Sequence, residues 1–212
     1  MDYKQTTAKI LIDIKAINFN FQNPFILTSG RKSPVYVDCR KIISFTKERN
    51  LIIQFMENYL RDNKIDFDLI AGGETAGIPY AAFLAERLQK PMIYIRKKPK
   101  GFGKKSQIEG NFNINEKSIL IEDLATDGKS KMSFIDTMRE NKIKINDTMV
   151  IFFYGIFEKA EEELKKQNIK IHYLCTWHDI LDEIKKEKKL ENNEIDSLEK
   201  FLFNSENWTK NG

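Results

Sequence analysis

Two adjacent acids, Glu122 and Asp123, directly follow the short apolar run at 119–121. A Thr-Asp-Gly turn comes next, and apolar residues then recur with helical spacing from residue 132 onward. The pattern predicts a buried strand, a loop and a helix N-terminus in one unit. Unpaired backbone N–H groups at the helix start can bind an anion, whereas the carboxylates favour sugar hydroxyls or a metal-bound part of a substrate. The stretch 118–131 therefore suits a phosphorylated sugar.

The same stretch contains a look-alike of a nucleotide-binding P-loop, formed by Gly128, Lys129 and Ser130. The first glycine of that motif would fall at position 123, where the chain has Asp123. The motif needs backbone that closely approaches a phosphate there, and a carboxylate repels it. The sequence therefore argues against an NTPase.

A second turn, Gly72-Gly73-Glu74-Thr75, follows the apolar run at 68–71. Its glycines allow the backbone to approach a ligand closely, and Thr75 with nearby N–H groups could hold a pyrophosphate. The alternative is a tight strand-to-helix turn with no ligand. Because the turn is expected at the same sheet edge as the acid pair, we favour a binding role.

These turns belong to a regular alternation of short apolar runs and helical patterns. The runs lie at 68–71, 92–95, 119–121, 149–154 and 170–174. Helices are expected at about 79–88, from the acid-pair loop to about 141, and at 158–167, 177–186 and 194–203. The alternation predicts an α/β fold in which a central, mostly parallel five-stranded sheet is flanked by helices. No repeat or linker is visible, so we expect a single domain over residues 1–212.

The N-terminal part has a different pattern. A helical apolar stripe covers 7–18, and two β-prone runs flank a polar turn within 23–38, which is typical of a hairpin. A further helix is expected from 46 to 60, with Thr46 as its N-cap.

Between 96 and 110 the alternation is interrupted by a segment with three glycines and six basic residues and no helical pattern. Structureless connections of this length are usually functional lids or disordered. A solvated surface loop and a nucleic-acid patch are the alternatives. Its place after a sheet strand favours a mobile, cationic lid over phosphates.

Composition sets wider limits. Apolar residues make up 41% and charged residues 31% of the 212 residues, and the formal charge of +4 permits an acidic small molecule or a nucleic acid. No apolar run approaches the roughly 18 residues of a membrane span, and no secretory signal is visible. Cys39 and Cys175 are expected to be reduced thiols of a cytoplasmic protein, and His172 and His178 lack partners at metal-ligand spacing.

Three segments together resemble one enzyme family. The segment 119–130 resembles the 5-phosphoribosyl-1-diphosphate (PRPP) signature of type I phosphoribosyltransferases. The segment 28–34 with Tyr36 is similar to the N-terminal substrate segment of orotate phosphoribosyltransferases, and 96–110 to their mobile catalytic loop. The resemblance runs from about residue 7 to 185 and implies a type I phosphoribosyltransferase-like fold with a small N-terminal hood at about 1–40.

The resemblance also implies an activity. The 5-phosphoribosyl group of PRPP would pass to orotate, giving orotidine 5′-monophosphate and pyrophosphate in de novo pyrimidine (UMP) biosynthesis. Mg²⁺ would be held mainly through PRPP, with no direct protein ligand. A homodimer with shared active sites is implied because the loop reaches the neighbouring subunit. Neither a nucleic acid nor a membrane is expected as a partner.

Site roles follow from the same resemblance. Glu122 and Asp123 would hold the ribose hydroxyls, and Lys100 with this pair forms the implied catalytic set. The implied PRPP-binding residues are Thr75, Arg96, Lys97, Lys100, Glu122, Asp123, Leu124, Ala125, Thr126, Asp127, Gly128, Lys129 and Ser130. The implied orotate-binding residues are Ser29, Gly30, Arg31, Tyr36 and Thr126.

Some positions differ from the pattern common in the family. Many members have a Lys where Thr28 and Ala76 stand, and a His or Tyr in place of Phe102. After the fourth strand many members also have an orotate-binding Arg, where this chain has Tyr154, Gly155, Ile156 and Phe157. We therefore hypothesise that Arg31 and backbone groups bind the orotate carboxylate. The alternatives are a phosphoribosyltransferase for another base and a PRPP-sensing, nucleic-acid-binding regulator on the same fold.

Overall fold

The computed structural model describes residues 2–27, 30, 32–99, 106–126, 129–205 and 208. Within α4 and α5 the side chains of residues 129, 130 and 158–160 are outside this description.

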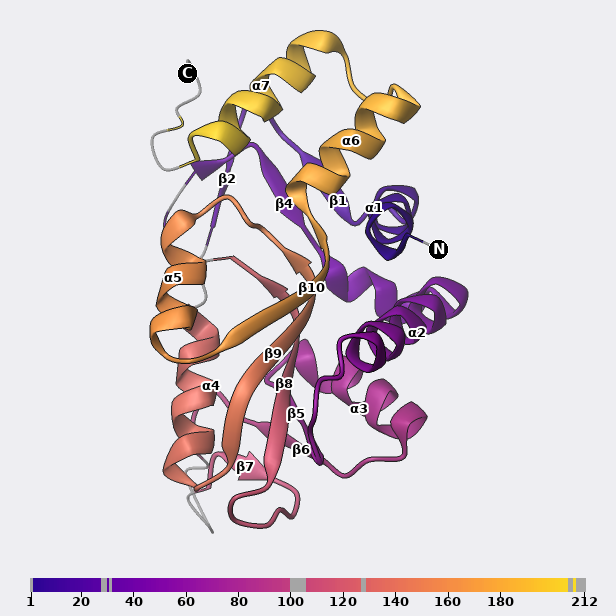
Figure 1. Cartoon of the computed structure of the whole chain (residues 1–212). Coiled ribbons are helices and arrows are strands. Elements are labelled where there is room, and N and C mark those ends of the chain that lie inside the picture. Colours follow the sequence, from indigo (N-terminus) through magenta and orange to yellow (C-terminus); the bar gives the residue numbers. More distant parts are fainter. Residues whose placement is uncertain are drawn as a thin grey trace.

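A six-stranded sheet in the order β10-β9-β8-β5-β6-β7 forms the centre of the molecule (Figure 1). The strands are β5 (Leu69–Gly73), β6 (Met92–Ile95), β7 (Ile108–Glu109), β8 (Lys117–Ala125), β9 (Lys144–Phe153) and β10 (Lys170–Thr176). The five long strands are all parallel, as the apolar runs predict. The expected α/β fold is thus confirmed.

The sixth strand, β7, corrects the prediction that 96–110 lacks structure throughout. It pairs antiparallel with β6, so that Ile108 lies opposite Ile95. The side chain of Ile108 is buried in the core, which explains why this part of the segment returns to the sheet edge.

Helices cover both faces of the sheet (Figure 1). One core cluster joins the sheet to α1 (Tyr3–Asp13), α2 (Thr46–Asp62), α3 (Gly77–Leu88), α6 (Trp177–Glu187) and α7 (Asn192–Phe203). The second cluster joins the opposite face to α4 (Lys129–Glu140) and α5 (Glu158–Lys166). Neighbouring residues of β8 alternate between them: Ile121 packs in the first cluster and Leu120 in the second. Two covered faces explain why the strands read as continuous apolar runs.

The N-terminal part adds two small antiparallel sheets. β1 (Ile17–Phe19) pairs with β4 (Val35–Val37), and β2 (Phe25–Ile26) pairs with β3 (Lys32–Ser33). The short 3₁₀ helix η1 (Cys39–Ser44) then leads into α2.

Three N-terminal predictions need correction. The stripe at 7–18 is not one helix, because the chain turns at Lys15 with a positive φ of 56° and Ile17 enters β1. Only β2 and β3 form the expected hairpin, since 35–37 pairs with β1 instead. Thr46 is the first residue of α2 and not its N-cap, because the Phe45 carbonyl already accepts the N–H of Arg49.

The remaining helices begin and end within about two residues of their predicted bounds. Among the described residues, no helix is long and apolar enough to cross a membrane.

Candidate active site

The carboxyl ends of β5, β6 and β8 meet at one edge of the sheet. β5 lies between β8 and β6, with Gly72 opposite Ile121 and Gly73 opposite Ile95. The glycine turn, the acid pair and the start of the cationic segment therefore lie side by side, although they are far apart in the sequence. Ligands of open α/β sheets bind at this edge.

The acid pair is almost completely buried, with Glu122 7% and Asp123 9% exposed. Because side chains alternate along a strand, the two carboxylates lie on opposite faces of β8. Glu122 lies over the β5 turn: a Cβ on Gly73 would come within 2.7 Å of its Cδ and 2.8 Å of Phe134 Cε2. Glycine at position 73 is thus required for Glu122 to occupy this place.

The burial of the pair changes its protonation. Burial raises the pKa of Glu122 to about 7, and the charge of Asp123 adds to this, whereas Lys131 and Lys97 act in the opposite direction. Burial also raises the pKa of Asp123, opposed by Lys131, by backbone N–H groups and by Arg40. Near neutral pH, Glu122 is therefore close to the midpoint between its two protonation states.

Lys131 on α4 lies next to this pair and was not among the predicted site residues. Its side chain is 1% exposed, and its Nζ donates to the Leu124 carbonyl at 2.7 Å and lies 3.7 Å from Glu122 Oε2. The sequence does contain a signal for it. Lys131 precedes Ile135 by four residues and Met138 by seven, so a cation occupies the buried stripe of the helix.

The glycine turn packs against β8. A Cβ on Gly77 would overlap the Ile121 carbonyl oxygen, so Gly77 lets the start of α3 approach the acid pair. Ala76 is the N-cap of α3, and Thr75 is exposed at the sheet edge. Gly77 thus packs tightly against β8, whereas Thr75 is exposed. The pyrophosphate role of Thr75 stays a prediction.

The ends of the cationic segment are held together. The Arg96 N–H donates to the Gln107 carbonyl at 2.8 Å, and Gln107 Nε2 donates to the Arg96 carbonyl at 3.2 Å. The Lys97 N–H donates to Glu74 Oε2 at 2.7 Å. This bond joins the paired ends of the cationic segment, which we call the base of the cationic loop, to the glycine turn. Lys100, Phe102 and Gly103 lie outside the described residues.

The predicted strand end and helix start on either side of residues 126–128 are both present. Ala125 is buried, and its carbonyl accepts the Tyr154 N–H at 2.9 Å. Thr126 is half-buried at the strand end, and α4 begins at Lys129, so a helix N-terminus follows the loop as expected. Asp127 and Gly128 lie outside the described residues.

The N-terminal segment reaches the same edge. Gly30 has a φ of 82° in the turn between β2 and β3, a conformation that favours glycine. The Tyr36 hydroxyl accepts from Arg40 Nη2 at 2.8 Å, and the charge of Arg40 acts on Asp123. Thr28, Ser29 and Arg31 lie outside the described residues.

Tyr154 is the first residue of the stretch 154–157, which differs from the pattern described above. It is 1% exposed and packs edge-on against Trp177, with ring centroids 5.7 Å apart. Tyr154 is therefore a core residue and does not offer its side chain to a ligand.

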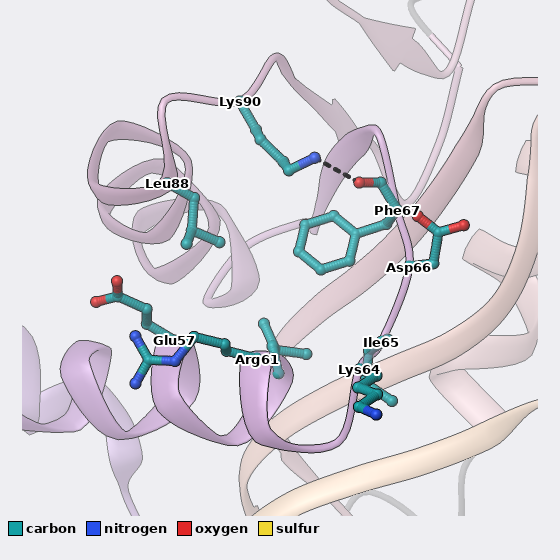
Figure 2. A pocket seen from close by; sticks show the side chains of 9 residues that line it. Glu57, Arg61, Lys64, Ile65, Asp66, Phe67, Leu88 and Lys90 are labelled. Carbon is teal, nitrogen blue, oxygen red and sulfur yellow. Dashed lines mark hydrogen bonds between the residues drawn. The ribbon is translucent and has the colours of Figure 1, made fainter.

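A hollow of about 380 Å³ lies at the opposite edge of the sheet, beside the ends of α2 and α3 (Figure 2). Lys90 donates to the Phe67 carbonyl at 2.6 Å and lies over its ring. Acids and cations mix along its wall, where Glu57 already pairs with Arg87. The hollow adjoins the amino ends of β5 and β6, so we assign it no part in the chemistry.

Within the described ranges, no group of three or more His, Cys, Asp or Glu residues could hold a metal ion.

No protein-family model matches the chain. The chain is 46% identical over 204 residues to the orotate phosphoribosyltransferase of Ruegeria sp. (strain TM1040), covering 95% of this chain and 90% of that protein. Its structure resembles the orotate phosphoribosyltransferase of Aeropyrum pernix, with a TM-score of 0.74, 29% identity and coverage of 84% and 98%. It also resembles the UMP synthase of Leishmania donovani, with a TM-score of 0.81 and 25% identity; the match covers 93% of this chain but only 42% of that one.

The central, mostly parallel sheet with helices on both faces and the likeness to the Aeropyrum pernix structure show the type I phosphoribosyltransferase fold. The 46% sequence identity over 95% of the chain identifies the family within this fold. The chain belongs to the orotate phosphoribosyltransferase family.

Proposed function

We propose that this protein transfers the 5-phosphoribosyl group of PRPP to orotate, giving orotidine 5′-monophosphate and pyrophosphate. The single observation that carries the proposal is the meeting of the acid pair, the glycine turn and the base of the cationic loop at one sheet edge, in a chain of this family.

PRPP binding divides among these elements. Glu122 and Asp123 accept hydrogen bonds from the ribose hydroxyls, because carboxylates are strong acceptors. The loop from Ala125 to the start of α4 at Lys129 binds the 5′-phosphate through backbone N–H groups at a helix N-terminus. Thr75, together with Arg96, Lys97 and Lys100, binds the pyrophosphate.

Orotate binds between the N-terminal turn and the strand end. Ser29, Gly30 and Arg31 contact the base, with Tyr36 and Thr126 beside it. Arg40 holds the Tyr36 hydroxyl in place. Since Tyr154 is part of the core, the orotate carboxylate is left to Arg31 and to backbone groups.

The chemistry is largely electrostatic. The bond between C1 and the pyrophosphate breaks with cationic charge on the sugar, and orotate N1 attacks from the opposite face, so no nucleophilic side chain is needed. Mg²⁺ would be held mainly through PRPP, where it would supply positive charge that stabilises the leaving pyrophosphate. The loop cations act on the same charge, and loop closure keeps water away from the sugar cation.

We further propose a homodimer with shared active sites, in which Lys100 reaches the partner's site. A cytoplasmic location agrees with Cys39 and Cys175, which are both buried free thiols.

The direct test is the loss of orotate absorbance when PRPP and Mg²⁺ are added. Turnover of uracil, adenine or guanine without turnover of orotate would refute the assignment. Salt-sensitive RNA binding in a mobility shift, again without turnover, would favour the alternative of a PRPP-sensing, nucleic-acid-binding regulator.

Asp123→Asn tests the ribose role. The substitution replaces a charged carboxylate acceptor with a neutral amide, which accepts a weaker hydrogen bond from the ribose hydroxyl. We therefore expect PRPP affinity to fall about tenfold or more in calorimetry. Asp66→Asn is the matched control, because Asp66 is an exposed acid that pairs with Lys117 near the amino end of β8. Unchanged PRPP affinity in Asp123→Asn would count against the ribose role.

A further inference from the structure

Lys131 is a fully buried cation that the proposed chemistry does not use. It extends from α4 toward the end of β8, and its side chain is 1% exposed. Burying an ammonium group is costly unless it is paired and hydrogen-bonded. Lys131 meets both conditions through the Leu124 carbonyl at 2.7 Å and Glu122 Oε2 at 3.7 Å.

The other oxygen of the Glu122 carboxylate, Oε1, lacks such a partner: it is buried and has no hydrogen-bond partner in the described structure. It lies against Gly73, where any side chain would overlap it. A carboxylate with one oxygen paired and the other free can accept a hydrogen bond from a ligand.

We propose that Lys131 is a positioning residue: its ammonium group favours the charged form of the Glu122 carboxylate and fixes it at the strand end, with one oxygen left for a ribose hydroxyl of PRPP. The inference rests on the proposed function for the identity of the ligand. The contact between Lys131 and Glu122 does not depend on it.

Three charged groups act on Glu122 in the described structure. Lys131 comes from α4, Lys97 from the segment after β6, and Asp123 from β8 itself. Burial and Asp123 favour the protonated carboxyl, while the two lysines favour the charged form. Lys131 is the stronger of these two cations and is fixed in the core, whereas Lys97 is exposed. Removal of Lys131 should therefore shift the protonation of Glu122 toward higher pH.

The test is the pH dependence of PRPP affinity, measured by calorimetry for the wild type and for Lys131→Met. The phosphates of PRPP titrate identically in both experiments, so the difference between the two curves isolates the protein. We expect equal affinities near about pH 9, about fivefold weaker binding by the variant near pH 7 and about tenfold weaker binding below about pH 6, as a shift of about one unit in the midpoint requires. The double variant Glu122→Gln/Lys131→Met should have the same pH dependence of PRPP affinity as Glu122→Gln alone.

Lys117→Met is the matched control. It removes an exposed lysine from the other end of β8, where it pairs with Asp66, and we expect its curve to match the wild type. A loss of affinity in Lys131→Met that is the same at every pH would overturn the proposal, because a purely structural role predicts that result.

Two further measurements cover a variant that does not fold. Lys131→Gln is neutral but keeps a donor for the Leu124 carbonyl, and it should show the same shift. In the wild type, the ¹⁵N signal of the Lys131 ammonium should move as Glu122 titrates around pH 7. A constant signal would overturn the proposal even if the protein failed to bind PRPP, whereas absent turnover of orotate would refute only the proposed function.

Discussion

Glu122 combines a structural cost with its proposed role. Its pKa is raised to about 7 in the folded protein, from an ordinary value of 4.5, because the carboxyl is buried. Between these two pH values the folded state binds more protons than the unfolded state, so stability falls as pH rises through this window. The molecule thus keeps a charged carboxylate at the strand end at the expense of stability near neutral pH.

Glu122→Gln should reveal this cost. The amide cannot ionise, so we expect the variant to gain stability relative to the wild type as pH rises from about 4.5 to 7, by at most about 3 kcal/mol. Urea unfolding at a series of pH values measures the difference. A difference that does not vary with pH would contradict the raised pKa.

Single residues also mark the limit of prediction from the sequence. The place of the acid pair at a strand end could be predicted, because the apolar run that precedes it is local in the sequence. The ion pair between Lys131 and Glu122 could not, since it depends on how α4 packs against β8. The burial of Tyr154 is a similar case, because its ring contact with Trp177 joins the residue after β9 to the start of α6, more than twenty residues later.

The long elements were more predictable than the short ones. Five runs that are apolar on both faces gave five parallel strands, because helices on both sides impose that pattern. β1 and β7 were missed because they have three and two residues, too few for a period to appear. Their pairing partners, β4 and β6, decide their conformation.

The base of the cationic loop is the element whose contacts most directly concern turnover. Glu74 joins the glycine turn to the loop by accepting the Lys97 N–H, so the two segments that we propose to bind pyrophosphate are linked. Glu74→Ala removes this bond and leaves the backbone pairing of Arg96 with Gln107 intact. A hydrogen bond to a charged group contributes about 1.5 kcal/mol, so we expect kcat to fall roughly tenfold.

Steady-state kinetics and thermal melting together check this prediction. Glu116→Ala is the control, because Glu116 accepts the Asn113 N–H at 2.8 Å in the same kind of contact on a distant turn. We expect both variants to melt within a few degrees of the wild type. Equal kinetics for the two variants would show that the link at Glu74 does not position the loop.

At the scale of the whole molecule, the proposed homodimer makes a prediction that a monomer cannot satisfy. In the proposed dimer, each active site contains Asp123 of one subunit and Lys100 of the other. Lys100→Ala and Asp123→Asn therefore change groups that two different subunits contribute to the same site. Each variant alone should have little activity. Lys100→Ala should also melt like the wild type, because we expect an open loop to pack against nothing.

Mixing the two variants, with subunit exchange, should restore activity. In a random mixture half of the dimers combine both variants, and each of these has one site with neither substitution, so about a quarter of wild-type activity should return. The measurement is orotate turnover before and after exchange, with sedimentation to confirm the dimer. If the loop acts within its own subunit, every site keeps one substitution and mixing restores nothing. Restored activity would therefore establish both the dimer and the crossing of the loop between its subunits.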